Sequence, residues 1–156
     1  MPLFPFRKRK LAGTLLVALQ FCALVGLIML ASPLALRGAV PLLALLLAGA
    51  SIALAAWTLV HNKPGNFNIR PTPKAWGTLI TTGPYRLIRH PMYTSVLLGG
   101  AALALIASSA LSWAAWSALA LVLVLKSKLE ERWMREQHLD YVAYARESKR
   151  FIPWVL

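Results

Sequence analysis

The chain has 156 residues, of which 58% are hydrophobic and 14% are charged, and its formal net charge is +12. Soluble domains carry about 45–50% apolar and about 25% charged residues, so this composition excludes an ordinary soluble domain and favours an integral membrane protein. The basic residues flank apolar segments and leave no separate basic domain, which argues against nucleic-acid binding.

The first two predicted membrane helices cover residues 11–31 and 39–60, with a short turn over 32–38 between them. Four basic residues at 7–10 precede the first helix, a pattern that also begins a secretory signal. The apolar part of such a signal has about 7–15 residues, whereas the 21 residues here span roughly 30 Å at about 1.5 Å per residue. We therefore expect a retained membrane anchor.

The remaining predicted elements are a loop, a helical hairpin and a polar C-terminal segment. Residues 61–90 are rich in proline and glycine, which favours a folded loop. The apolar stretch 92–125 is too long for one ordinary span and contains serines near its middle, so we expect two short helices, 92–107 and 110–127. Residues 128–156 are expected to form a cytosolic amphipathic helix and a tail. The predicted fold class is an all-α integral membrane protein with four transmembrane helices.

The distribution of charge predicts how the chain is oriented. With four spans, both termini and the loop share one side, which carries every Lys and Arg except Arg37. Such an excess predicts that both termini are cytoplasmic, in a bacterial inner membrane or an equivalent one. The acidic residues lie on the same side, in the C-terminal segment: Glu130, Glu131, Glu136, Asp140 and Glu147.

Residues 82–93 concentrate ionisable side chains beside the start of an apolar helix. Two arginines, a histidine and two tyrosines lie there, and Pro84 and Pro91 stiffen the segment. Ionisable groups at a membrane boundary are costly and usually serve a function. Because the acidic C-terminal segment is predicted on the same side, the two segments could enclose a pocket open to both cytosol and lipid. Such a pocket suits an enzyme that joins a water-soluble cofactor to an apolar substrate.

The motifs resemble those of membrane-embedded methyltransferases, namely the isoprenylcysteine carboxyl methyltransferases and the related phospholipid methyltransferases. The resemblance covers residues 80–154, and one position departs from the pattern, because Ser95 stands where a glycine is usual. The motifs that carry it are Thr82-Gly83-Pro84-Tyr85, Arg89-His90-Pro91, Tyr93, Glu130-Glu131, Tyr141, Tyr144 and Arg150-Phe151-Ile152-Pro153.

The resemblance implies S-adenosylmethionine as methyl donor, bound without a soluble-type Rossmann domain. Methyl transfer mainly needs two reactants held in position, so we expect no metal. It implies that His90 and Tyr93 contact the donor, and that Arg89 orients the donor's carboxylate or supports the loop. The implied catalytic residues are Arg150, Glu130 and His90. The implied cofactor site comprises Tyr85, Arg89, His90, Pro91, Tyr93, Glu130, Glu131 and Tyr141.

The two glutamates have different alternatives. One of them is expected to bind the donor's amino group or ribose hydroxyls. Glu131 has Arg135 at i+4, a spacing typical of a surface ion pair. Glu130 is our first choice, because on one continuous helix it would share a semi-apolar face with Met134, Gln137, Tyr141 and Tyr144.

The acceptor and the reaction class leave several hypotheses open. We expect a lipid-like or prenylated acceptor and favour O-methylation of a carboxylate, because Arg150 and Arg86 could hold an anion and bases are scarce. N-methylation of a phospholipid amine requires a base, and a thiol acceptor is a third case. Other classes are an NADPH-dependent sterol-type reductase and a non-enzymatic module whose basic rim attracts anionic lipid. The identity of the acceptor and the oligomeric state stay open.

Overall fold

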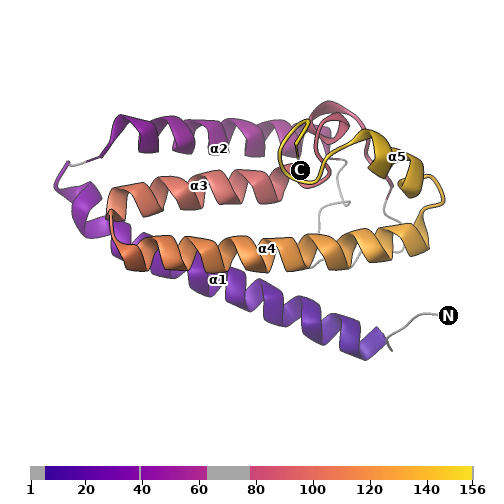
Figure 1. The fold of residues 1–156 in the computed structure, drawn as a ribbon, viewed down its shortest axis with the longest axis horizontal. Helices are drawn as coiled ribbons and strands as arrows, with labels where there is room; N and C mark the ends of the chain where they lie inside the picture. The colour runs from indigo at the N-terminus through magenta and orange to yellow at the C-terminus, as the bar shows by residue number, and fades with distance from the viewer. Residues whose placement is uncertain (1–5, 39, 63–77, 156) are drawn as a thin grey trace.

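The computed structural model of the chain describes residues 6–38, 40–62 and 78–155 (Figure 1). Within these ranges the chain is helical apart from turns and one isolated bridge, which confirms the predicted all-α class. The elements are α1 (Phe6–Leu36), α2 (Leu42–His61), the 3-10 turn η1 (Gly83–Arg86), α3 (Pro91–Ala107), α4 (Ala110–Gln137) and α5 (Tyr141–Glu147).

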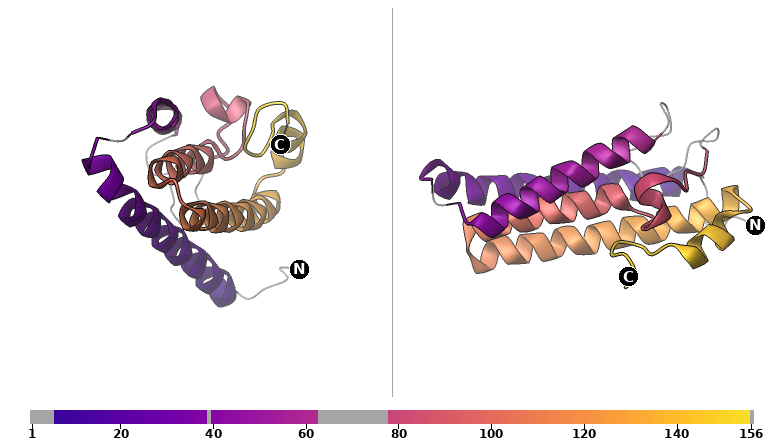
Figure 2. Two further views of the ribbon diagram at one scale, coloured as in Figure 1. Left: turned by 60° about the vertical axis from the view of Figure 1, so that its left-hand side comes forward. Right: turned by 90° about the horizontal axis from the view of Figure 1, so that it is seen from above.

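The four long helices lie side by side, each roughly antiparallel to the next along the chain (Figures 1 and 2). Helix α3 is the central one, because it packs against α1, α2 and α4. The start of α1, the end of α2, the start of α3 and the end of α4 lie at one end of the bundle, where η1 and α5 also lie. This antiparallel order brings polar segments that are distant in the sequence to one place.

Within the described ranges, three helices are long and apolar enough to cross a membrane: Leu11–Leu36 within α1, α2, and α4. Helix α3 is shorter, with 17 residues or about 25 Å at 1.5 Å per residue. Many large apolar side chains of α1 and α2 are exposed, as expected for helices that face lipid. The chain thus has the character of an integral membrane protein.

Small residues line the bundle interior on the α3 side. One cluster of the buried core consists of Leu27, Ala104, Leu119 and Leu123. A Cβ atom added at Gly100 would lie 3.0 Å from Cδ2 of Leu119 on α4, so the Leu119 side chain would have to shift to admit it. Small residues therefore set the close approach of these helices.

Ser95, which replaces a glycine of the family pattern, is compatible with close packing. Its side chain is 2% exposed, and its hydroxyl donates to the carbonyl of Met92. Its own carbonyl accepts a hydrogen bond of 2.7 Å from Oγ of Ser51 on α2. The serine is accommodated because its hydroxyl bonds within its own helix while its backbone binds the neighbouring one.

Helix α1 is longer than predicted. It continues through residues 32–36 with Pro33 inside it, so most of the predicted turn over 32–38 is helical. The break between α3 and α4 falls at Ser108 and Ser109, as the hairpin prediction had it. Ser108 is left-handed with φ +44°, and Ser109 forms a capping box with Ser112 that satisfies the first free amides of α4.

The C-terminal segment, for which one amphipathic helix followed by a tail was expected over 128–156, contains parts of two helices. Helix α4 continues from the apolar hairpin through Gln137, and α5 begins only at Tyr141. Between them His138 has extended backbone angles of −122° and 117°, which ends the helix. The argument that Glu130, Tyr141 and Tyr144 share one helical face is therefore wrong, because α4 and α5 are separate helices.

The Gly83→Ala variant is expected to unfold at a lower temperature than the wild type. Gly83 has φ +59°, and an added Cβ would overlap the ring of His61 at the end of α2. The left-handed conformation alone costs a non-glycine residue roughly 1–2 kcal/mol. Thermal unfolding in detergent measures the loss. Gly26→Ala on α1 is the control, because nothing lies within 4 Å of its added Cβ, and an unchanged midpoint for Gly83→Ala would contradict the clash.

Candidate functional site

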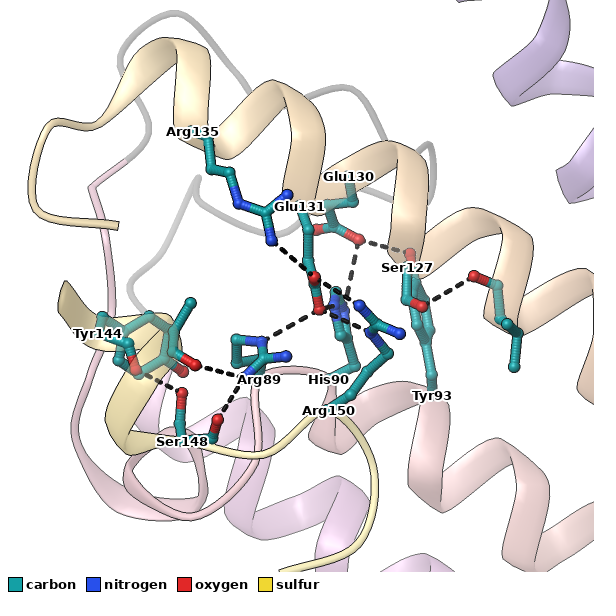
Figure 3. A network of polar contacts seen from close by, with 12 residues as sticks. Arg89, His90, Tyr93, Ser127, Glu130, Glu131, Arg135, Tyr144, Ser148 and Arg150 are labelled. Atoms are coloured by element: carbon teal, nitrogen blue, oxygen red, sulfur yellow. Dashed lines mark hydrogen bonds and ion pairs between the residues drawn. The ribbon is translucent and has the colours of Figure 1, made fainter. Parts of the chain in front are cut away.

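The centre of the candidate site is the carboxylate of Glu131, on the last turns of α4 (Figure 3). Its side chain is 1% exposed. Arg150 binds it in a bidentate manner, with Nε and Nη2 each 2.8 Å from a carboxylate oxygen. Nε of Arg89 lies 3.0 Å from Oε1, Nε2 of His90 lies 3.3 Å from it, and Nη2 of Arg135 lies 3.4 Å from Oε2.

This arrangement makes Glu131 a structural junction. It joins α4 to the residues before α3 and to the C-terminal tail, and a buried carboxylate among three guanidinium groups stays ionised. The i,i+4 ion pair with Arg135 that the sequence suggested is present at 3.4 Å. The Glu131 carboxylate is nevertheless buried, and its closest partners are Arg89 and Arg150.

Backbone pairing reinforces the junction. Ile88 and Lys149 form an isolated parallel bridge. The amide of Arg89 donates to the carbonyl of Lys149 at 2.7 Å, and the amide of His90 donates to the carbonyl of Arg150 at 3.1 Å. The tail is thus held directly against the segment that precedes α3.

Arg89 supports this segment from its other side. Its Nη1 donates to the carbonyl of Ala145 at 3.0 Å and also to the carbonyl of Ser148. With its Nε on Glu131, the guanidinium connects α4, α5 and the tail. Of the two roles expected for Arg89, the contacts match support of the loop.

The tyrosines beside the junction are neutral at physiological pH. The hydroxyl of Tyr144 donates to the carbonyl of Tyr85 at 2.7 Å, which fixes α5 against η1. Burial, with a smaller contribution from the Glu130 carboxylate, raises the pKa of Tyr85 to about 12. Burial also raises the pKa of Tyr144 to about 12 and raises that of Tyr141. These phenols can donate hydrogen bonds but do not serve as bases.

Glu130 differs from its neighbour in partners and in exposure. Its side chain is 32% exposed, and its Oε2 accepts a hydrogen bond of 2.8 Å from the hydroxyl of Tyr93. Nδ1 of His90 lies 3.7 Å from the same oxygen. The rings of His90 and Tyr93 are stacked, with centroids 5.2 Å apart and planes 1° from parallel. Glu130, Tyr93 and His90 thus form one side of the cluster, where the Glu130 carboxylate is partly exposed. We call these three residues the open edge of the site.

The structure brings the predicted site residues from three parts of the chain into one region. Pro91 begins α3 and Tyr141 begins α5, and both are buried supports rather than exposed groups. Lys126 was not among the predicted site residues. Its spacing of four residues from Glu130, which puts both on the same helical face, is the signal that could have identified it. The six predicted side chains in direct polar contact are Arg89, His90, Tyr93, Glu130, Glu131 and Arg150.

A groove of about 400 Å³ adjoins the cluster between η1 and α5. Cavities of roughly 300–1,000 Å³ are typical of small-molecule sites. Among the described residues, no group of three or more His, Cys, Asp or Glu side chains is placed to hold a metal ion. The groove is lined by Leu79, Thr81, Arg86, Asp140, Ala143, Tyr144, Glu147 and Ser148.

Comparison with known proteins gives one family and one curated relative. The family model described as phospholipid methyltransferase matches residues 39–140. The cobalt-zinc-cadmium resistance protein CzcN of Cupriavidus metallidurans is 37% identical over 78 residues, which cover 49% of this chain and 36% of that protein. The match therefore spans little more than a third of the length of this relative. No solved structure matches the chain.

Proposed function

The chain belongs to the phospholipid methyltransferase family, and we propose that it transfers a methyl group from S-adenosylmethionine to a lipid-like acceptor at the membrane interface. Membership implies methyltransferase chemistry. The donor, the acceptor and the roles of individual residues are the proposal. Because basic residues gather at the end of the bundle that holds the site, we place this end at the cytosolic face.

The observation that carries the proposal is the difference between the two adjacent glutamates. The carboxylate of Glu131 is fully engaged by arginines and His90, so its role is to organise the site. The carboxylate of Glu130 is partly exposed and has a neutral hydroxyl as its closest partner. It is available to a cationic ligand, and the donor carries both a sulfonium and an ammonium group.

The residues around Glu130 suit a reaction that depends on positioning. Methyl transfer is an in-line displacement, which mainly needs the two reactants held in the right geometry. The stacked rings of His90 and Tyr93 come from the start of α3, and Glu130 comes from α4. We assign these three side chains to the donor site, with Tyr85, Arg89, Pro91, Glu131 and Tyr141 as their support.

For the acceptor, the contacts of Arg150 favour an amine over a carboxylate. The sequence suggested that Arg150 holds an anionic acceptor, but its Nε and Nη2 both bind Glu131. The hydrogen bond to Glu131 also raises the pKa of Arg150, which keeps this pair ionised. An amine acceptor must lose a proton as it is methylated. His90, beside Glu130, is the base that we assign to this step.

Transfer of label from the donor tests the function. The purified protein, incubated with methyl-labelled S-adenosylmethionine and vesicles of phosphatidylethanolamine and phosphatidylcholine, is expected to give a labelled phospholipid. Omitting phosphatidylethanolamine is the control and should abolish the label. In a parallel incubation with total membrane lipid, mild base separates the acceptor classes, because a methyl ester releases volatile methanol whereas an N-methyl group stays on the head group. Binding of NADPH without binding of S-adenosylhomocysteine would contradict the proposal.

A further inference from the structure

One turn before Glu130 on α4, a lysine is buried among the membrane helices. The side chain of Lys126 on α4 is 1% exposed, and its Nζ lies 2.5 Å from Oε1 of Gln20 on α1. Gln20 is itself 8% exposed. Lysine within a transmembrane segment is rare and costly, and by default it indicates a function.

The lysine also contacts the open edge of the site. Its Nζ lies 5.0 Å from the centroid of the Tyr93 ring, within the range of a cation–π contact. The hydroxyl of the same ring donates to Glu130. Lys126 lies one turn before Glu130 on α4, so both residues face Tyr93 from the same side of the helix. A continuous series of contacts therefore runs from Gln20 through Lys126 and Tyr93 to Glu130.

Gln20 connects the site to a helix outside the family match. The matched range begins at residue 39, whereas α1 ends at Leu36. Around Gln20 the helix is apolar, and the neighbouring Leu19 and Phe21 are exposed at the surface of the bundle. The buried amide is thus a specific polar contact between α1 and the helices that carry the site.

We propose that Lys126 and Gln20 are positioning residues for Tyr93. Gln20 holds the ammonium of Lys126, the ammonium holds the Tyr93 ring, and the ring keeps its hydroxyl on the Glu130 carboxylate. The carboxylate then stays in the orientation that receives a cationic ligand. This inference rests on the proposed function, in which Glu130 faces the methyl donor.

Binding of S-adenosylhomocysteine to the full chain in phosphatidylcholine nanodiscs tests the inference. Lys126→Met keeps the length of the side chain and removes its charge, so we expect about a tenfold weaker affinity, and a smaller loss for Lys126→Arg. Gln20→Leu should weaken binding in the same direction. Leu19→Ala, beside Gln20 but 54% exposed, is the matched control and should bind as the wild type does.

A double variant separates positioning from general packing. Tyr93→Phe removes the hydroxyl that passes the effect to Glu130, so Lys126→Met should weaken binding less than about twofold in that background. An undiminished loss there would overturn the proposal, and so would a normal affinity of Lys126→Met. A wild type that does not bind S-adenosylhomocysteine would instead overturn the proposed function. Glu130→Gln binding as tightly as the wild type would overturn the assignment of Glu130 to the donor site, on which this inference rests.

Discussion

The Glu131→Gln variant is expected to be markedly less stable than the wild type and to lose methyl transfer. The amide removes the charge that Arg89, Arg150 and His90 surround at a side-chain exposure of 1%. Removing one partner of a buried ion pair costs about 3–5 kcal/mol, because the remaining charges lose their compensation. Since Arg150 is 25% exposed and can be partly solvated, we expect about 3 kcal/mol. Thermal or denaturant unfolding in detergent measures the loss.

The comparison variant for this prediction is Arg135→Gln. Arg135 also contacts Glu131, but at 3.4 Å and with half of its side chain exposed. Exposed ion pairs contribute about 0–1 kcal/mol, so this variant should unfold close to the wild type. Equal stability of Glu131→Gln and the wild type would show that the junction does not hold the site together.

The Glu130→Gln variant should fold normally and bind the methyl donor much more weakly. Its carboxylate is 32% exposed and its closest partner is a neutral hydroxyl, which an amide oxygen can also serve. Loss of a charged hydrogen-bond partner for a cationic ligand costs roughly 1.5–3 kcal/mol, which corresponds to about a ten- to hundredfold weaker affinity. Calorimetric titration with S-adenosylmethionine, alongside the unfolding midpoint, gives both quantities.

Glu136→Gln makes the same chemical change on the same helix at an exposed position outside the cluster. It controls for the net charge of the chain and should leave donor affinity unchanged. The assignment of Glu130 fails if both variants lose the same affinity, because the effect would then reflect overall charge. It also fails if Glu130→Gln lowers the unfolding midpoint as much as Glu131→Gln does.

Most of the fold followed from the sequence because its signals are local. Long apolar runs predict membrane helices, and Ser108 and Ser109 interrupt one run at the place where α3 ends and α4 begins. The ends of the long helices were harder to place. Pro33 did not end α1, and the change from apolar to polar residues near 127 did not end α4. Polarity marks where a helix leaves an apolar environment, whereas backbone hydrogen bonds decide where the helix ends.

The structure brings six of the predicted site residues into contact, whereas the difference between the two glutamates was not predictable from the sequence. Motif spacing selected Glu130 and Glu131 together. Which one is buried depends on where Arg89 and Arg150 arrive in space, 42 and 19 residues away from Glu131 in the chain. The spacing of Lys126 from Glu130 was visible in the sequence, but its contact with Gln20, 106 residues distant, was not. Long-range contacts of this kind have no local pattern.

The two-residue link between α3 and α4 has a consequence for the order of folding. Residues 88 and 149 are far apart in the sequence, and closing a flexible loop of that length by chance costs conformational entropy. Once the α3–α4 hairpin has formed, its two antiparallel helices bring these residues close together, and most of that cost has been met locally. The bridge and the Arg150–Glu131 pair can then form after the hairpin, and their formation is fast. A chain whose hairpin fails to insert into the membrane would therefore keep its motifs and still lack a site.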